Sequence, residues 1–288
     1  MNKKTIGNEP IYDARTLGAP RMLVLGFQHM FAMFGATVLV PTLTGLSVST
    51  TLLFAGLGTL LFHLLAKGKV PAFLGSSFAF LGGYAAIAPM LENPNSPGVF
   101  NVPNTELLPY ACFGVACAGL VYLVLSLLFK VFGVRKVMRF FPPIVTGPII
   151  IAIGLSLSSS AVNNCATSWP VALVAILVVI VCNIWGKGMI KIIPILLGVI
   201  ASYLVGAVSG QVDFTAVREA AWIGLPVTWS ETVFGLFGSG NVDTAMLATA
   251  AITIIPISLA TMVEHIGDMC AISSTCGRNY IQEPGLHR

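Results

Sequence analysis

The sequence predicts an all-α polytopic membrane protein with about eight transmembrane helices. Of the 288 residues, 56% are hydrophobic and only 9% are charged, whereas a soluble globular protein carries roughly 25% charged residues. The chain therefore cannot cover its surface with polar groups. Its net charge of +4 comes from short basic clusters between apolar runs, a pattern that does not indicate nucleic-acid binding.

The apolar residues are gathered into eight runs. Each run is about long enough to cross a hydrocarbon core of ~30 Å as a helix. The polar arm before the first run is too long for a secretory signal peptide, so we expect that run to be retained as a span. The runs lie near residues 22–43, 48–66, 70–90, 108–129, 142–162, 169–185, 192–209 and 250–276.

The Lys and Arg residues fall on alternate connections between these runs. Fourteen of the 15 lie in the N-terminal arm, after the second, fourth and sixth runs, or beyond the eighth, and the exception is Arg218. Because cytosolic loops carry an excess of Lys and Arg, we expect both ends of this chain in the cytosol. Of the connections expected outside, residues 92–104 are rich in Pro and Asn and should be irregular, and 210–249 form a longer loop.

Two acidic residues interrupt the eighth run. Nine of the 11 acidic residues lie in arms or loops, and only Glu264 and Asp268 fall within a run. A carboxylate at mid-bilayer costs on the order of 2.5–3.5 kcal/mol on insertion scales, so such residues indicate a functional site. If the buried window is 254–276, Glu264 lies near its centre. If the span began at Ala245, Glu264 would instead approach the cytosolic end.

The i,i+4 spacing of Glu264 and Asp268 puts both carboxylates on one helix face, about one turn apart. Like charges this close, away from bulk water, should not both stay ionised. An acid that can take up a proton suits a proton-coupled transporter. The alternative is a structural role, in which the polar pair ties this helix to its neighbours through hydrogen bonds.

Polar or small residues also interrupt the first and third runs. Gln28 and His29 lie in "FQHMFAMFGATVLVP", and Glu264 and His265 repeat their order, which would pair the first and eighth spans of an inverted repeat. The third run contains "VPAFLGSSFAFLGGY" (70–84), whose Gly and Ser residues suit a discontinuous span with backbone groups facing a ligand. Close packing of helices through small residues is the alternative.

Other chemistry receives no support from the sequence. The six cysteines show no zinc-type spacing, and most lie in apolar runs, where they are expected to pack as small hydrophobic residues. No phosphate-binding loop, nucleophile elbow or metal-ligand cluster occurs. We therefore predict a protein that is not an enzyme and that holds no cofactor or metal.

Several stretches together resemble the nucleobase–ascorbate transporter family of nucleobase:cation symporters, and most of all its bacterial uracil permeases. They are "QHMFAMFGATVLVP", "KGKVPAFLGSSFAF", "FPPI", "EHIGD" and "EPGLHR", and the likeness runs from about residue 15 to the C-terminus. The resemblance implies a permease that imports uracil across the cytoplasmic (inner) membrane by proton symport. It also implies fourteen spans in two inverted seven-span repeats, of which this chain holds the first repeat, with a discontinuous third span, and the first span of the second.

The same resemblance divides the chain between a core domain and a gate domain. The implied parts are a cytosolic arm (1–21), core-domain spans 1–4 (22–129), gate-domain spans 5–7 (130–209), an external loop (210–249), core-domain span 8 (250–276) and a cytosolic end (277–288).

By resemblance, Glu264 would hydrogen-bond the N–H and carbonyl edge of the base, Phe78 would pack against its ring, and Ala36 would line the pocket through its backbone. Asp268 stands where some uracil permeases have histidine, so the identity of the proton carrier stays open. The residues expected to couple the proton or support the site are Asp268, His265, His29 and Gln28.

The family continues past "PGLHR" with further spans that supply the second half of the site, including another carboxylate. We therefore expect the isolated 288-residue chain not to transport. The implied partners are uracil and the lipid bilayer, and a homodimer is common in the family. The alternatives are a permease for xanthine or another purine base, and a truncated membrane protein that does not transport.

Overall fold

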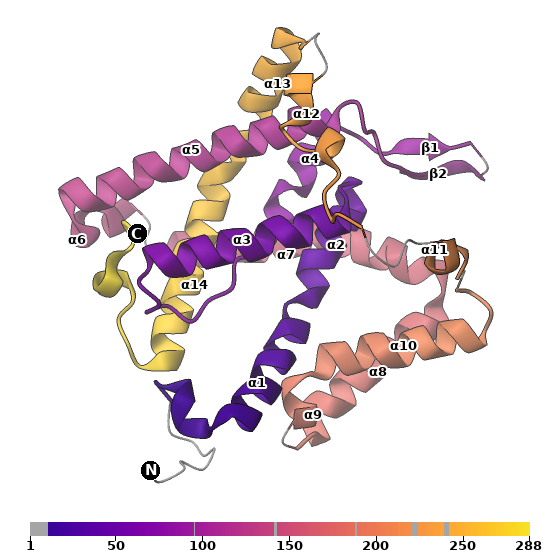
Figure 1. Cartoon of the computed structure of the whole chain (residues 1–288), viewed down its shortest axis with the longest axis horizontal. Helices are drawn as coiled ribbons and strands as arrows, with labels where there is room; N and C mark the ends of the chain where they lie inside the picture. Colours follow the sequence, from indigo (N-terminus) through magenta and orange to yellow (C-terminus); the bar gives the residue numbers. More distant parts are fainter. Residues whose placement is uncertain are drawn as a thin grey trace. The chain divides into compact units, whose positions relative to one another are not determined.

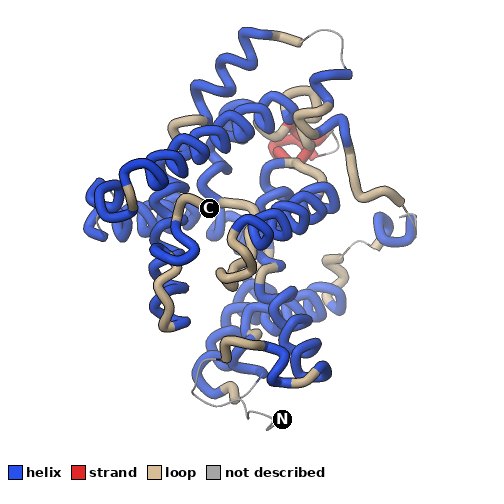
Figure 2. Tube along the Cα trace, turned by 60° about the vertical axis from the view of Figure 1, so that its left-hand side comes forward, coloured by secondary structure: helices blue, strands red, loops and turns tan. Residues whose placement is uncertain are grey.

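The computed structural model describes residues 11–94, 96–140, 143–187, 189–212, 214–219, 224–238 and 242–288. Lys3 and Lys4 of the N-terminal arm and the first two residues of "FPPI" lie outside these ranges. Figure 2 shows that helices dominate the described residues, which confirms a mainly helical protein.

The helices, in chain order, are α1 (Ala19–Ala32), α2 (Phe34–Thr44), α3 (Val48–Leu65), α4 (Leu81–Ile87), α5 (Leu108–Phe132), α6 (Val134–Val137), α7 (Pro143–Thr167), α8 (Trp169–Trp185), α9 (Met189–Ile192), α10 (Pro194–Val208), α11 (Thr215–Glu219), α12 (Gly235–Gly238), α13 (Thr244–Ile254) and α14 (Ile257–Cys276). Short 3-10 turns occupy Ala14–Leu17, Phe78–Phe80, Met138–Phe140 and Trp229–Glu231. Two strands, β1 (Leu91–Asn93) and β2 (Ser96–Val102), form an antiparallel hairpin.

The chain forms two compact units, one containing residues 1–35 and 154–225 and the other residues 36–153 and 226–288. In the first unit, α8 and α10 pack against each other (Figure 1). Gly198 permits this contact, because a Cβ atom at that position would lie 2.6 Å from Val179 Cγ2 and 3.1 Å from the carbonyl oxygen of Ala175. A small residue therefore sets how closely the two helices approach, as is common within membranes.

In the second unit, α5 packs against α13, α14 and α4 (Figure 1). The core between them contains eight buried residues: Tyr84, Ile87, Ala88, Leu108, Ala111, Ala118, Ala250 and Ile254. Helix α13 begins at Thr244 because Asp243 caps it, accepting hydrogen bonds from the backbone N–H groups of Ala245 and Met246. The site described below is built within this unit.

Three of the described helices are long and apolar enough to cross a membrane: Val48–Leu65, Leu108–Phe132 and Thr244–Cys276, the last containing a turn. Shorter apolar helices occupy Phe78–Ile87, Trp169–Trp185 and Pro194–Val208. Such helices agree with a polytopic membrane protein. The number of spans stays a prediction.

Many large apolar side chains on these helices are exposed. Leu64 of α3 is 75% exposed and Leu123 of α5 is 65% exposed. In water such surface would favour aggregation, whereas lipid tails are as apolar as leucine and can cover it. The exposed side chains therefore support a membrane environment.

The apolar runs at 22–43 and 250–276 are each divided rather than continuous. Met33 separates α1 from α2, and the second run contains a turn at Ile255–Pro256 between α13 and α14. Pro256 has no backbone N–H and so cannot continue the hydrogen-bond ladder of α13. The loop expected at residues 210–249 ends earlier than predicted, because Asp243 caps α13 and the helix begins at Thr244.

The expectation that residues 92–104 are irregular is wrong, since most of them form the β1–β2 hairpin. Leu91 pairs with Val102 and Glu92 with Phe100, and the register shifts twice along the pair. Gly98 adopts φ +83°, and its N–H donates to the carboxylate of Glu92 at 2.6 Å. The hydrophobic residues of β2 favour a strand, and they outweigh the turn-forming Pro and Asn that suggested a loop.

The C-terminal segment, residues 277–288, lies against α3, α5 and α6. Leu286 packs with Met269 and Tyr280 in one cluster and with Phe129 and Val137 in another. The carbonyl oxygen of His287 accepts a hydrogen bond from Ser126 at 2.5 Å. The segment thus joins the ends of several helices.

Lys69 forms an exposed ion pair with Glu283 of this segment, with a distance of 2.5 Å between Nζ and Oε1. The hydrogen bond and the charge of Lys69 hold the pKa of Glu283 below its usual value. The contribution of the pair to stability is therefore present at neutral pH and is lost as the pH falls through that lowered pKa. Exposure to solvent keeps the contribution small.

The contact between α5 and α13 predicts that Gly114→Ala destabilises the protein. A Cβ atom at Gly114 would lie 2.7 Å from Ile254 Cδ1 and 2.8 Å from the carbonyl oxygen of Ala250, so the two helices would have to separate. We expect a loss of about 1–3 kcal/mol in the free energy of unfolding, seen as a lower midpoint in thermal unfolding in detergent.

Gly119→Ala on the same helix is the matched control, because a Cβ atom there has nothing within 4 Å. Alanine is the better helix former, so this change should be neutral or stabilising. Equal destabilisation by both substitutions would contradict the packing of α5 on α13.

Candidate functional site

The acidic pair lies on α14, which follows the turn at Pro256 and ends at Gly277, a residue with φ +62°. Glu264 is half-buried and Asp268 is exposed. Their i,i+4 spacing places them one turn apart on one helix face, where their charges repel each other. Helix α14 thus presents a face with two interacting carboxylates.

The segment at residues 70–77 interrupts the third apolar run, because it forms neither helix nor strand. Its middle is held by Thr59 of α3, whose hydroxyl accepts a hydrogen bond from the Leu74 N–H at 3.1 Å and donates to the Leu74 carbonyl oxygen at 3.2 Å. Pro71, Gly75 and two serines disfavour a helix here. The Thr59 hydroxyl therefore serves the Leu74 N–H and shares its single proton between the carbonyl oxygens of Leu74 and of Ala55, the latter 2.8 Å away.

Ser77 ends the segment and begins the turn at Phe78–Phe80 that leads into α4. Its backbone is extended, with φ −92° and ψ 130°, and its hydroxyl accepts from the Ala79 N–H at 3.3 Å. The Ser77 side chain also lies close enough to the carboxylate of Glu264 to interact favourably with it. This interaction joins the interrupted segment to the acidic face of α14.

Two further elements meet at the same place. The Phe78–Phe80 turn packs against α14. Phe78 directly follows Ser77, whose side chain interacts with Glu264. Helix α2 approaches the segment through buried Thr37, whose Oγ1 atom lies 3.0 Å from where a Cβ atom of Gly75 would be. Ala36 precedes Thr37 on α2. The elements that carry the three residues predicted to bind substrate, α2, the Phe78–Phe80 turn and α14, thus all belong to one unit.

Tyr122, Thr261 and Ser77 belong to this site and were not predicted from the sequence. The Tyr122 hydroxyl on α5 donates to Thr261 Oγ1 on α14 at 2.8 Å, and its ring meets that of His265 edge to face, with centroids 6.4 Å apart. Tyr122 is a polar aromatic residue inside an apolar run, and that signal could have identified it.

The predicted supporting residues separate into two groups. His265 and Asp268 lie on α14 beside Glu264, and their charges interact. Gln28 and His29 lie in α1, which belongs to the other unit. The side chain of Gln28 is outside the described part of the structure, and a role for either residue in the site stays a prediction.

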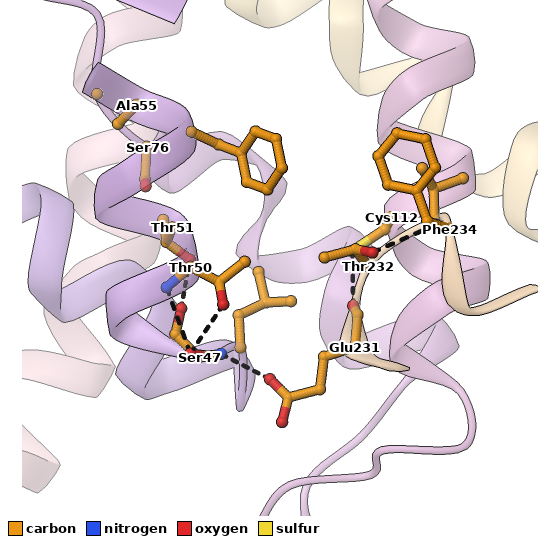
Figure 3. Close-up of a pocket in the computed structure, with 13 residues that line it drawn as sticks. Ser47, Thr50, Thr51, Ala55, Ser76, Cys112, Glu231, Thr232 and Phe234 are labelled. Atoms are coloured by element: carbon orange, nitrogen blue, oxygen red, sulfur yellow. Dashed lines mark hydrogen bonds between the residues drawn. The ribbon is translucent and has the colours of Figure 1, made fainter. Parts of the chain in front are cut away.

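A pocket of about 380 Å³ lies within the same unit, between α3, α5, the interrupted segment and the turn at residues 229–234 (Figure 3). Among the side chains that the structure describes, neither Glu264 nor Phe78 lines it. Its lining residues are Leu46, Ser47, Thr50, Thr51, Phe54, Ala55, Gly75, Ser76, Cys112, Glu231, Thr232, Val233 and Phe234.

Hydrogen bonds hold the turn at residues 229–234 against the helix ends. The Ser47 N–H at the start of α3 donates to Glu231 Oε2 at 2.9 Å, and the Cys112 thiol donates to the Glu231 carbonyl oxygen at 3.4 Å (Figure 3). The Thr228 N–H donates to Thr50 Oγ1 at 2.8 Å. A carboxylate at the N-terminus of a helix is stabilised by the helix dipole, so Glu231 anchors this wall of the pocket.

The helical architecture, the exposed apolar surface and a carboxylate beside an interrupted segment are typical of a membrane transporter. Comparison with known proteins agrees, because residues 20–288 match the model of a permease family (Xan_ur_permease). The chain belongs to this permease family. Permeases are transporters and not enzymes.

Individual relatives carry more specific names. The chain is 38% identical to the uracil permease of Bacillus caldolyticus over 297 residues, an alignment that covers 100% of this chain and 62% of the relative. It is 36% identical to the uracil permease of Bacillus subtilis (91% of this chain, 58% of the relative). It is 38% identical to the probable uracil permease of Haemophilus influenzae (92% and 59%). The chain thus spans about three-fifths of the length of these relatives.

The Tyr122–Thr261 hydrogen bond predicts a non-additive pair of substitutions. Tyr122→Phe removes the donor but keeps the ring, and we expect a loss of about 0.5–1.5 kcal/mol in the free energy of unfolding. Thr261→Val should cost a similar amount alone and little more when Tyr122 is already phenylalanine. Unfolding of the three variants in detergent tests this, and fully additive losses would show that the two side chains do not interact.

Proposed function

We propose that this chain supplies one part of the substrate site of a proton-coupled uracil transporter. The observation that carries the proposal is the packing of the Phe78–Phe80 turn against α14, together with the interaction of Ser77 with the Glu264 carboxylate. These contacts bring an acid of α14 close to the interrupted segment. The names of the relatives support uracil as the substrate and favour it over a purine base. Transport would require the remaining length that those relatives possess.

The chemistry of uracil fits these side chains. The base presents ring N–H donors beside carbonyl acceptors, and a carboxylate is a strong acceptor for such N–H groups. Glu264 would accept from the ring, while the Phe78 side chain would cover one face of the planar base. Ala36 would contribute backbone only.

Ser77 would act as a positioning residue. A serine hydroxyl can donate to a carboxylate while it accepts from a backbone N–H, and Ser77 makes both of these contacts. The interaction with Ser77 restricts the orientation of the Glu264 carboxylate before the base arrives, which lowers the entropy that is lost on binding.

Proton symport is the coupling that the acidic face supports best. Two carboxylates one turn apart repel each other, and binding of one proton relieves that repulsion. Glu264 and Asp268 are the candidate carriers, with His265 interacting with Asp268. A proton that enters together with the base would allow the acidic face to change its exposure without moving a net negative charge through the membrane.

The larger assembly is proposed on the same basis. We propose that the protein lies in the cytoplasmic (plasma) membrane. Both ends of this chain would face the cytosol, as the positions of Lys and Arg favour. A core domain with spans 1–4 and 8 would move against a gate domain with spans 5–7. We also propose a homodimer, because the family that the sequence resembles often forms one.

Glu264→Gln should abolish most uracil uptake by the chain extended to the length of its relatives. Loss of a charge-assisted hydrogen bond, at about 1.5–3 kcal/mol, reduces binding on the order of 10- to 100-fold. Radiolabelled uracil uptake in cells that lack their own permease measures this. Glu106→Gln, at an exposed residue of the turn before α5, is the matched control and should leave uptake unchanged. Equal uptake by the wild type and Glu264→Gln would reject the site.

Uptake by the extended protein should also fall when an uncoupler collapses the proton gradient. The reason is that the acidic face must be loaded with a proton from outside for each base that enters. The same cells and labelled uracil serve for the measurement, with sodium gradients varied separately. Uptake that persists under the uncoupler and follows sodium would reject proton coupling while leaving the base site intact.

A further inference from the structure

The pocket at residues 47–55 and 231–234 is not explained by the proposed uracil site. Its volume of about 380 Å³ falls in the range of small-molecule pockets, ~300–1,000 Å³. Four elements from three separate regions of the sequence build it: α3 with the interrupted segment that follows it, α5 and the 229–234 turn (Figure 3). The pocket is therefore formed by tertiary contacts and is large enough for a small molecule.

The polar groups of the lining offer both donors and acceptors. Within the described residues, Glu231 Oε2 is taken by the Ser47 N–H, whereas the second carboxylate oxygen has no hydrogen-bond partner. The Thr51 hydroxyl donates to the Ser47 carbonyl oxygen at 2.9 Å, and its oxygen can still accept a hydrogen bond from a ligand N–H. In the same described region the Ser76 hydroxyl has no hydrogen-bond partner, so it can donate to a carbonyl oxygen.

Two phenylalanine rings supply apolar walls of the same pocket. Phe54 and Phe234 both line the pocket, and Figure 3 shows the ring of Phe234 at its edge. Trp229 meets Phe234 edge to face, with ring centroids 5.7 Å apart, which fixes that ring. Aromatic walls with a few convergent hydrogen-bonding groups are typical of sites for planar heterocycles.

The interrupted segment forms a wall shared by this pocket and the Glu264 site. Ser76 lines the pocket, while the side chain of the next residue, Ser77, interacts with Glu264. Ser77 has extended backbone angles, and consecutive side chains of an extended chain point to opposite sides. The backbone at Ser76–Ser77 therefore separates the pocket from the acidic face that carries Glu264.

We propose that this pocket is a second binding site for a small planar heterocycle that carries ring N–H and carbonyl groups. Glu231 and Thr51 accept from its N–H groups, Ser76 donates to a carbonyl oxygen, and the phenylalanine rings enclose it. The site lies next to the Glu264 site across the Gly75–Ser77 backbone. Uracil is chosen as the probe because of the proposed function.

The test measures equilibrium binding of radiolabelled uracil to the purified chain in lipid nanodiscs. In a Glu264→Gln background, saturable binding should remain, because the second site does not use Glu264. Adding Thr51→Val and Ser76→Ala should then weaken it at least ~10-fold, since two hydrogen bonds at roughly 1 kcal/mol each are lost. Both changes nearly preserve side-chain shape and should leave the helices folded.

Thr249→Val is the matched control for Thr51→Val. Thr249 lies exposed on α13, and its hydroxyl bonds the carbonyl oxygen four residues earlier, as that of Thr51 does. This variant should bind uracil like the Glu264→Gln background. In parallel, 1,3-dimethyluracil, which keeps the planar ring and both carbonyl groups but carries N-methyl groups in place of both ring N–H groups, should fail to compete.

The two proposals fail in different ways. If Glu264→Gln alone removes all saturable binding, or if 1,3-dimethyluracil competes as well as uracil, the second site is rejected. Binding that depends on Glu264 and ignores Thr51 and Ser76 would leave the proposed function standing without the second site. Binding that depends on Thr51 and Ser76 but is the same with and without Glu264→Gln would support the second site. The first site is then decided by uracil uptake through the extended protein, in which the Glu264→Gln substitution is tested with the remaining length present.

Discussion

The site depends on one constraint, which is that a backbone leaving the helical conformation in a membrane must find partners for its own N–H and C=O groups. Residues 70–77 face this problem, and Thr59 of α3 solves part of it by bonding both backbone groups of Leu74. Ser77 then caps the turn that restarts the helix. The non-helical segment is therefore held in place by side chains of its neighbours.

This arrangement explains why charge is tolerated on α14. A half-buried carboxylate is unfavourable unless polar groups surround it, and the Ser77 side chain interacts favourably with the Glu264 carboxylate. The same serine that ends the interrupted segment thus serves the acid. Tyr122 adds a second tie between α5 and α14 through Thr261, which limits how α14 can rotate. Polar contacts, rather than apolar burial alone, set the position of the acidic face.

The sequence predicts the parts of the fold that arise from local patterns. Apolar runs give most of the helices, Gly and Ser residues give the interruption at 70–77, and i,i+4 spacing gives the shared face of Glu264 and Asp268. Contacts between distant residues escape such reasoning: Tyr122 and Thr261 are 139 positions apart, and no pattern in either helix indicates that they meet. The β1–β2 hairpin differs from the prediction because its Pro and Asn residues favour a loop while its hydrophobic residues favour a strand. The start of α13 differs because a single capping residue, Asp243, decides it.

The central claim is that the interrupted segment and α14 together hold the substrate. Determining the structure of the chain, extended to the length of its uracil permease relatives, with uracil bound would test it most directly. The account predicts a ring N–H of the base within about 3 Å of a Glu264 carboxylate oxygen, with the Phe78 ring against one face of the base. A base bound without contact to Glu264 or Phe78 would contradict it.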